Sequence, residues 1–180
     1  MKIQSAFVLG LSELALSMLA CGYVLAAAPP LTASKTITID ASAAKVWLAS
    51  KDFNGLNTWH PAVATDEIVD GKNNSVGAVR LLTLKGGGTI KEKLLAFNPA
   101  DRSFKYAILE GVLPVSGYTA TFVVKSVGKN KASVAWTGHF KRKNVGANPA
   151  ANEDDKTALD TIGGVYQAGL DNLKRIVEAQ

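Results

Sequence analysis

Six consecutive segments of alternating apolar and polar residues, between Ala62 and Lys143, constrain the fold of this chain more than any other feature. Runs rich in Gly, Asn, Pro and Asp separate them and favour turns. In order, the segments are AVATDEIV, GAVRLLTL, TIKEKLLAF, RSFKYAIL, GYTATFVVKSV and KASVAWTGHFK. Because side chains of a strand point alternately to its two faces, each segment predicts a strand with one buried face. Most joints are short enough for hairpins, so the pattern favours an antiparallel meander.

Shorter elements are predicted before this region. The segment KTITI places Ile37 and Ile39 on one face and predicts a first strand, which closes one edge of a seven-stranded sheet. The segment DASAAKVWLAS predicts a short helix capped by Asp40 or Ser42. Residues 53–59 predict a second, weaker helical turn that ends before the proline at position 61.

A long amphipathic helix is predicted at the end of the chain, from Asp154 to Glu178. Its first residues are acidic, as helix N-termini favour, and apolar residues recur at three- and four-residue steps. Glycine is unfavourable inside a helix by about 1 kcal/mol. We therefore expect Gly163, Gly164 and Gly169 to allow close packing or to leave room for a ligand. The predicted fold class is α+β, with a curved antiparallel sheet wrapped around this helix.

Length and composition indicate one globular domain. The chain has 180 residues, of which 47% are hydrophobic and 19% charged, so it can bury a single core. We expect a signal peptide at residues 1–26, a linker at residues 27–34 and the folded domain at residues 35–180.

The signal peptide is predicted from Lys2, the apolar run that follows it and the small residues before two prolines. Cleavage is expected after Ala26, which would deliver the protein to the periplasm or outside the cell. A membrane anchor is the alternative, but Glu13 interrupts the run at a cost of about 2.5–3.5 kcal/mol in a spanning helix. Cys21, the only cysteine, offers a lipoprotein as a minor alternative. Because Cys21 lies within the predicted signal peptide, the mature chain would contain no cysteine and could form no disulfide.

The net charge is +5 and remains +5 after cleavage, because the signal peptide carries one lysine and one glutamate. Such a charge favours acidic protein partners. Lysines are scattered apart from the group Lys141–Lys143, and no interleaved aromatic residues accompany them. Nucleic acid is therefore not expected as a partner.

The alternation in the strands predicts which side chains face the interior. Tyr118, Phe122 and Trp136 share the apolar faces of their strands, and Tyr106 falls on the same side. In TIKEKLLAF the lysines face solvent, which turns Glu92 inward.

Glu92 needs a partner, because an unpaired buried charge is costly. A three-residue turn at residues 86–88 would place Leu82 opposite Glu92 and Arg80 diagonally beside it. We therefore predict an Arg80–Glu92 pair. The pair either orders the sheet or holds a polar group of a ligand.

Several local phrases carry a resemblance to a known family. They are ASAAKVW, FNGLNTWHPAV, GAVRLLTL, GGGTIKEKLL, YAILEGVLPVSGYTATFVV, VAWTGHF and GVYQAGLDNLK. Over residues 35–178 the chain resembles the SRPBCC superfamily of helix-grip proteins, in its polyketide cyclase/dehydrase and lipid-transport branch. This superfamily includes START lipid-transfer domains and the birch-pollen-allergen family. The sequence is also similar to exported accessory proteins of bacterial methanol oxidation.

The resemblance implies that Trp59 is a lid and His60 stands at the rim of a cavity. For His60, a structural role, ligand contact and proton transfer remain open. The alternation turns His139 outward, so no multi-histidine metal site is expected, and neither a metal nor a cofactor is predicted. The predicted ligand-binding residues are Trp59, His60, Arg80, Glu92, Tyr106, Tyr118, Phe122 and Trp136.

Three functions follow as expectations. The first is a non-catalytic periplasmic accessory protein that binds a small hydrophobic ligand in an apolar cavity and assists methanol oxidation. The second is a cyclase or dehydratase in which Arg80 and Glu92, assisted by His60, polarise a carbonyl or move a proton. The third is a protein-interaction module that uses its basic surface.

Overall fold

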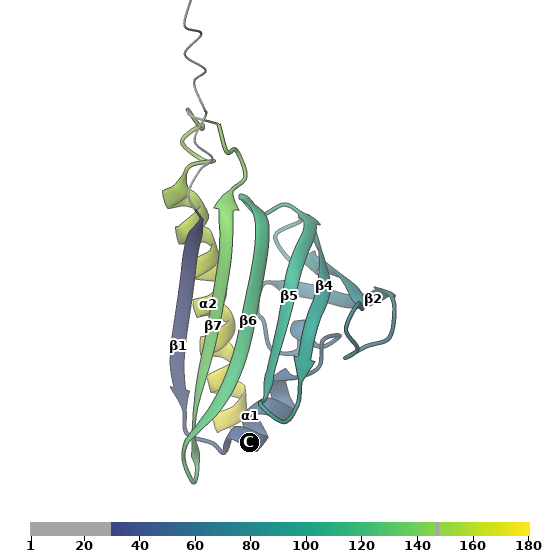
Figure 1. Ribbon diagram of the computed structural model, residues 1–180. Coiled ribbons are helices and arrows are strands. Elements are labelled where there is room, and N and C mark those ends of the chain that lie inside the picture. Colours follow the sequence, from purple (N-terminus) through teal and green to yellow (C-terminus); the bar gives the residue numbers. More distant parts are fainter. Residues whose placement is uncertain (1–29, 147) are drawn as a thin grey trace, which may run out of the picture.

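A computed structural model describes residues 30–146 and 148–180 of the protein. One seven-stranded antiparallel sheet curves around a long C-terminal helix (Figure 1). The predicted signal peptide, its cleavage site after Ala26 and Cys21 lie outside the described residues.

The sheet follows the predicted meander. The strands run in the spatial order β1-β7-β6-β5-β4-β3-β2, so each strand from β2 to β7 pairs with its neighbour in sequence. Their bounds are β1 Leu31–Ile39, β2 Val63–Asp70, β3 Val79–Leu84, β4 Thr89–Asn98, β5 Ser103–Gly111, β6 Val115–Gly128 and β7 Lys131–Arg142. The six alternating segments and the closing first strand are thus confirmed.

Strand β1 starts four residues earlier than predicted, so residues 31–34 belong to the sheet and not to a linker. Leu31 lies opposite Phe140 at the far end of β7. Hydroxyl side chains also bridge the two strands, with Thr32 Oγ1 3.0 Å from His139 Nδ1 and Ser34 Oγ 2.8 Å from Thr137 Oγ1. The small and polar residues that suggested a linker are therefore cross-strand partners of β7.

One α-helix and one 3-10 turn follow β1, in place of the two short helices predicted. Helix α1 spans Ala43–Ser50, and the side chain of its N-cap, Ser42, accepts a hydrogen bond from the backbone of Lys45. The turn η1 covers only Leu56–Thr58. Glycine and asparagine around η1 disfavour a longer helix, which explains the difference.

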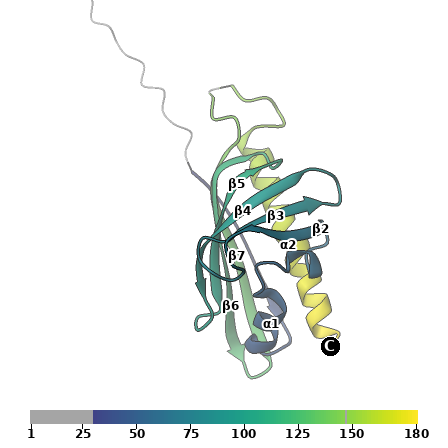
Figure 2. The same cartoon turned by 90° about the vertical axis from the view of Figure 1, so that its right-hand side faces the viewer.

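Helix α2 spans Asp155–Glu178, and its N-cap Asp154 accepts a hydrogen bond from the backbone of Thr157. Its apolar face crosses the concave side of the sheet, nearest β1 and β7 (Figure 2). The residues buried on this face are Ala158, Ile162, Tyr166, Gly169, Leu170, Leu173 and Val177. Among the described residues, no helix has the length and apolarity needed to cross a membrane.

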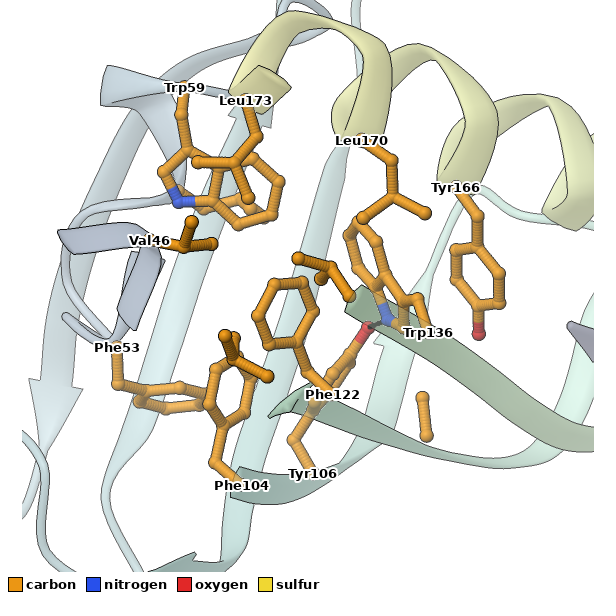
Figure 3. Packing of buried hydrophobic residues seen from close by; sticks show 14 of the residues in the cluster. Val46, Phe53, Trp59, Phe104, Tyr106, Phe122, Trp136, Tyr166, Leu170 and Leu173 are labelled. Carbon is orange, nitrogen blue, oxygen red and sulfur yellow. Dashed lines mark hydrogen bonds between the residues drawn. The ribbon is translucent and has the colours of Figure 1, made fainter. Parts of the chain in front are cut away.

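Aromatic side chains from the sheet, from the segment after α1 and from α2 gather between the sheet and the helix (Figure 3). Trp136 of β7 stacks on Tyr166 of α2 with ring centroids 4.5 Å apart. Trp59 packs against Trp136 and Phe122, at 5.7 and 5.8 Å between centroids. The side chains that were expected to wall a hollow interior thus pack largely against one another.

Candidate functional site

The buried ion pair predicted from the sequence is present, but in a different register. Arg80 of β3 lies directly opposite Glu92 of β4, and Leu82 lies opposite Ile90. The predicted turn at residues 86–88 was wrong by one residue, since Leu84 donates its backbone N–H to the carbonyl of Gly88. The turn thus covers residues 85–87, and the positive φ angles of Gly87 and Gly88, 92° and 82°, permit this closure.

All three guanidinium nitrogens of Arg80 are engaged. Nε and Nη2 both donate to Oε2 of Glu92, at 2.8 and 2.6 Å. Nη1 donates to the carbonyl of Phe53 at 2.7 Å and to Oδ2 of Asp66 at 3.2 Å. The guanidinium also lies over the ring of Phe53, 4.2 Å from its centroid. These contacts fix Arg80 in the wall of the core and explain how a charge can be only 3% exposed there.

Asp66 is a third member of the ion cluster that the sequence did not predict. It is buried on β2 and accepts the backbone N–H of Leu56 at 2.8 Å. A register shift between Val63 and Thr65 changes which side chains of β2 face inward. Strict alternation from Val63 would turn Asp66 to solvent. Asp66 could have been identified only from a feature of the sequence that predicts this bulge.

The cluster holds two carboxyl groups against one guanidinium, and this imbalance favours protonation. Burial raises the pKa of Glu92 and of Asp66 above their ordinary values, although the charge of Arg80 opposes both shifts. Burial alone would lower the pKa of Arg80, but Glu92 and Asp66 outweigh it and raise that pKa. Among the described residues, Oδ1 of Asp66 has no hydrogen-bond partner.

An internal cavity of about 70 Å³ lies beside this cluster, between the sheet and the first half of α2. Its wall is mainly apolar and includes Val63, Leu82, Ile90 and Ile162. Glu92 also lines it. A cavity of about 150 Å³ holds benzene, and drug-sized ligands occupy about 300–1,000 Å³. The space is therefore smaller than either of these sites and fits only a small molecule or the end of a larger one.

The predicted ligand-binding residues divide into two groups. His60, Glu92, Tyr106, Tyr118 and Trp136 line the cavity. Trp59, Arg80 and Phe122 do not. Trp59 is a core residue and not a lid, and Phe122 stacks on Phe104 with centroids 5.1 Å apart. Arg80 is not part of the cavity wall, because its guanidinium is bound to the buried carboxyl groups of Glu92 and Asp66.

His60 forms backbone hydrogen bonds through both ring nitrogens. Nε2 lies 3.0 Å from the carbonyl of Val165 on α2, and Nδ1 accepts the N–H of Ala62 at 3.2 Å. This pattern requires the neutral tautomer with its proton on Nε2. Burial lowers the pKa of His60, despite the bond to Val165 that favours the charged form. The histidine thus joins the η1 turn to α2 and is only 3% exposed.

A chain of aromatic hydroxyl groups forms the polar part of the cavity wall. The indole N–H of Trp136 donates to the hydroxyl of Tyr106 at 3.0 Å, which lies 3.3 Å from that of Tyr118. Tyr118 in turn bonds Tyr166. Burial raises the pKa of Tyr106 and Tyr118 well above the ordinary value, so all remain protonated. Three O–H protons share two hydroxyl contacts, which leaves one donor without an acceptor among the residues that the structure describes.

Other predicted features are less prominent in the structure. His139 is exposed and faces outward. Arg142, the middle residue of the basic group Lys141–Lys143, is bound to Asp155 and to two backbone carbonyls. Residues 30–146 and 148–180 contain no group of three or more metal-binding side chains.

Residues 30–178 match the family described as polyketide cyclase / dehydrase and lipid transport. The chain belongs to this family. The match spans the whole described sheet and α2, as the resemblance in sequence predicted. The family's shared fold leaves the chemistry of each member to its own side chains.

Solved structures of similar proteins support the same fold. A protein of uncharacterised role from Bacillus thuringiensis is 29% identical, with a TM-score of 0.72 over 82% of this chain and 98% of that one. The protein XoxI from Bacillus cereus is also 29% identical, with a TM-score of 0.71 over 81% and 94%. The ZhuI aromatase/cyclase from Streptomyces sp. R1128 shares the fold at 19% identity, with a TM-score of 0.67 over 83% and 94%.

Proposed function

We propose that this protein is a non-catalytic binding protein that holds a small hydrophobic ligand in the cavity between its sheet and α2. The observation that carries the proposal is the mainly apolar cavity of about 70 Å³. Burial of apolar surface stabilises a complex by about 25 cal/mol per Å². Cavity size selects a small molecule, or the apolar end of a larger one.

An accessory role in the periplasm is the finer part of the proposal. It is supported by the signal-like residues 1–26 and by the resemblance to exported accessory proteins of methanol oxidation. The similarity to XoxI, at 29% identity, supports a relationship but supplies no ligand. In this role the protein would deliver or sense a small molecule for an acidic partner protein.

Catalysis by Glu92 is a second candidate, favoured by one observation. Glu92 lines the cavity and burial raises its pKa, as a general acid requires. His60 is unavailable for proton transfer in this arrangement, because both ring nitrogens bond backbone groups. The cavity is also small for a polyketide chain. Glu92→Gln would abolish turnover of any substrate if this candidate function holds.

Native extraction followed by mass spectrometry tests the binding function. We expect a small hydrophobic molecule to leave the protein on denaturation. Val165→Phe, in the cavity wall, should reduce its amount, whereas Leu159→Phe on the same helix should not, because Leu159 is outside that wall. A protein that is always empty, and binds no added hydrophobic compound, would contradict the proposal.

A further inference from the structure

Strands β5 and β6 are paired over only part of their length. Their ladder runs from the pair Ser103–Val123 to the pair Ala107–Thr119 and then stops. Beyond it, β5 continues along β4 as far as Gly111, and β6 continues along β7 from Val115. The register of β6 on β7 shifts at residues 116–119. The sheet is therefore open between β5 and β6 at this end.

A groove of about 400 Å³ occupies the opening. Its lining includes Leu113 of the β5–β6 connection, which lies at the same end of the sheet as the start of α2 (Figure 1). Ile108, Leu113 and Tyr118 line both this groove and the internal cavity. A single layer of side chains thus separates the two spaces. Leu113 belongs to the short connection between the strands, so its displacement would join them.

The walls of the groove combine apolar residues with one available positive charge. Leu109 and Val112 are 52% and 53% exposed beside it. Lys143 lines the groove, and its backbone N–H bonds the carbonyl of Pro114 at 3.0 Å, which holds it there. Lys143 forms no ion pair with the residues that the structure describes. The acidic residue of the groove, Glu110, lies 3.3 Å from Lys91.

We propose that the opening between β5 and β6 is a second binding compartment, which takes the anionic head of a short amphipathic molecule. The apolar end passes Leu113 into the internal cavity, and the head stays in the groove near Lys143. This inference rests on the proposed function, because it assigns the cavity's occupant to a chemical class. The volume of the cavity limits the buried end to a short alkyl group.

Hexanoate, 1-hexanol and hexylammonium test this assignment, because they share one chain and differ in head group. Calorimetric titration of the isolated protein at low salt should give roughly fivefold tighter binding of hexanoate than of hexylammonium, the scale of an exposed ion pair. Lys143→Glu should reverse that preference. Lys129→Glu is the matched control, since Lys129 is an exposed lysine in the turn at the opposite end of β6 and should leave the preference unchanged.

Leu113→Trp tests whether the apolar end of the ligand passes Leu113 to enter the internal cavity. A larger side chain at the boundary should weaken binding of all three probes by on the order of tenfold. If this variant fails to fold, the head-group comparison with Lys143→Glu decides alone. Equal binding of hexanol and hexanoate, with no effect of Lys143→Glu, would overturn the second compartment and leave the cavity function standing. If none of the probes binds the unaltered protein, the cavity function itself fails.

Discussion

Arg80 is the residue on which the polar part of the interior depends. It forms ion pairs with two buried carboxyl groups, those of Glu92 and Asp66, and donates a hydrogen bond to the carbonyl of Phe53. Arg80→Met should therefore destabilise the protein by about 3–5 kcal/mol, the usual cost of leaving a buried charge without its partner. Urea unfolding at pH 7 measures the change. A loss below about 1 kcal/mol would show that the carboxyl groups are not held by Arg80.

Glu92 should give the stability a specific pH dependence. Its pKa in the folded protein is raised above the ordinary value of 4.5. Its contribution is therefore fully present below pH 4.5 and is lost as the pH rises through the folded pKa. Glu92→Gln cannot titrate, so the unaltered protein should lose stability relative to this variant as the pH increases from 4.5. Parallel stability curves of the two proteins would contradict the shift.

His60 should make the stability depend on pH in the opposite direction to Glu92. Its folded pKa is lowered from the ordinary value of 6.5, so the unfolded chain takes up the proton first as the pH falls. Stability is then present above pH 6.5 and declines below it. His60→Gln can still donate to the carbonyl of Val165 and should remove this decline, at a cost of about 1 kcal/mol for the lost bond to Ala62. Denaturant titrations between pH 5 and pH 8 would show it.

Among the elements, α2 shows why glycine is needed at one position and not at another. A Cβ on Gly169 would lie 2.5 Å from Cδ2 of His60 and 3.1 Å from Trp136. A Cβ on Gly164 would meet nothing within 4 Å. The close approach expected from the sequence thus applies to Gly169, which lets the η1 turn and β7 pack against the helix.

Alanine substitutions separate these two glycines. Gly169→Ala should destabilise the protein by about 1–3 kcal/mol through overpacking. Gly164→Ala should stabilise it by about 1 kcal/mol, because alanine is the better helix former. Thermal and denaturant unfolding of both variants gives the comparison. Stabilisation by Gly169→Ala would mean that His60 is not held against the helix.

The elements also show how far the sequence predicts this structure. Alternation was sufficient for the six strands and for the inward direction of Glu92, Tyr106 and Trp136. Alternation could not reveal Asp66, because the bulge in β2 changes which of its side chains face inward. Nor could it reveal that the turn between β3 and β4 begins one residue earlier than predicted. The break between β5 and β6 was equally hidden, since each strand continues beyond it along its other neighbour, β5 along β4 and β6 along β7.

At the scale of the whole molecule, the sheet and α2 enclose less space than the fold suggests. The aromatic residues predicted to wall the cavity mostly pack together: Trp136 packs against its neighbour Phe122 on the sheet, against Trp59 and against Tyr166 of α2. What remains is a small cavity with Glu92 and the tyrosine hydroxyl groups in its wall, next to an open groove. The proposed function requires that this remaining space is accessible to a ligand.

Methyl NMR during titration with 1-butanol tests that requirement most directly. We predict saturable chemical-shift changes at methyl groups of the cavity wall, in Val63, Ile90 and Ile162, and little change at Val46 and Leu173, which are buried elsewhere in the core. Shift changes that spread equally over both sets, or none at either, would contradict a ligand-accessible cavity.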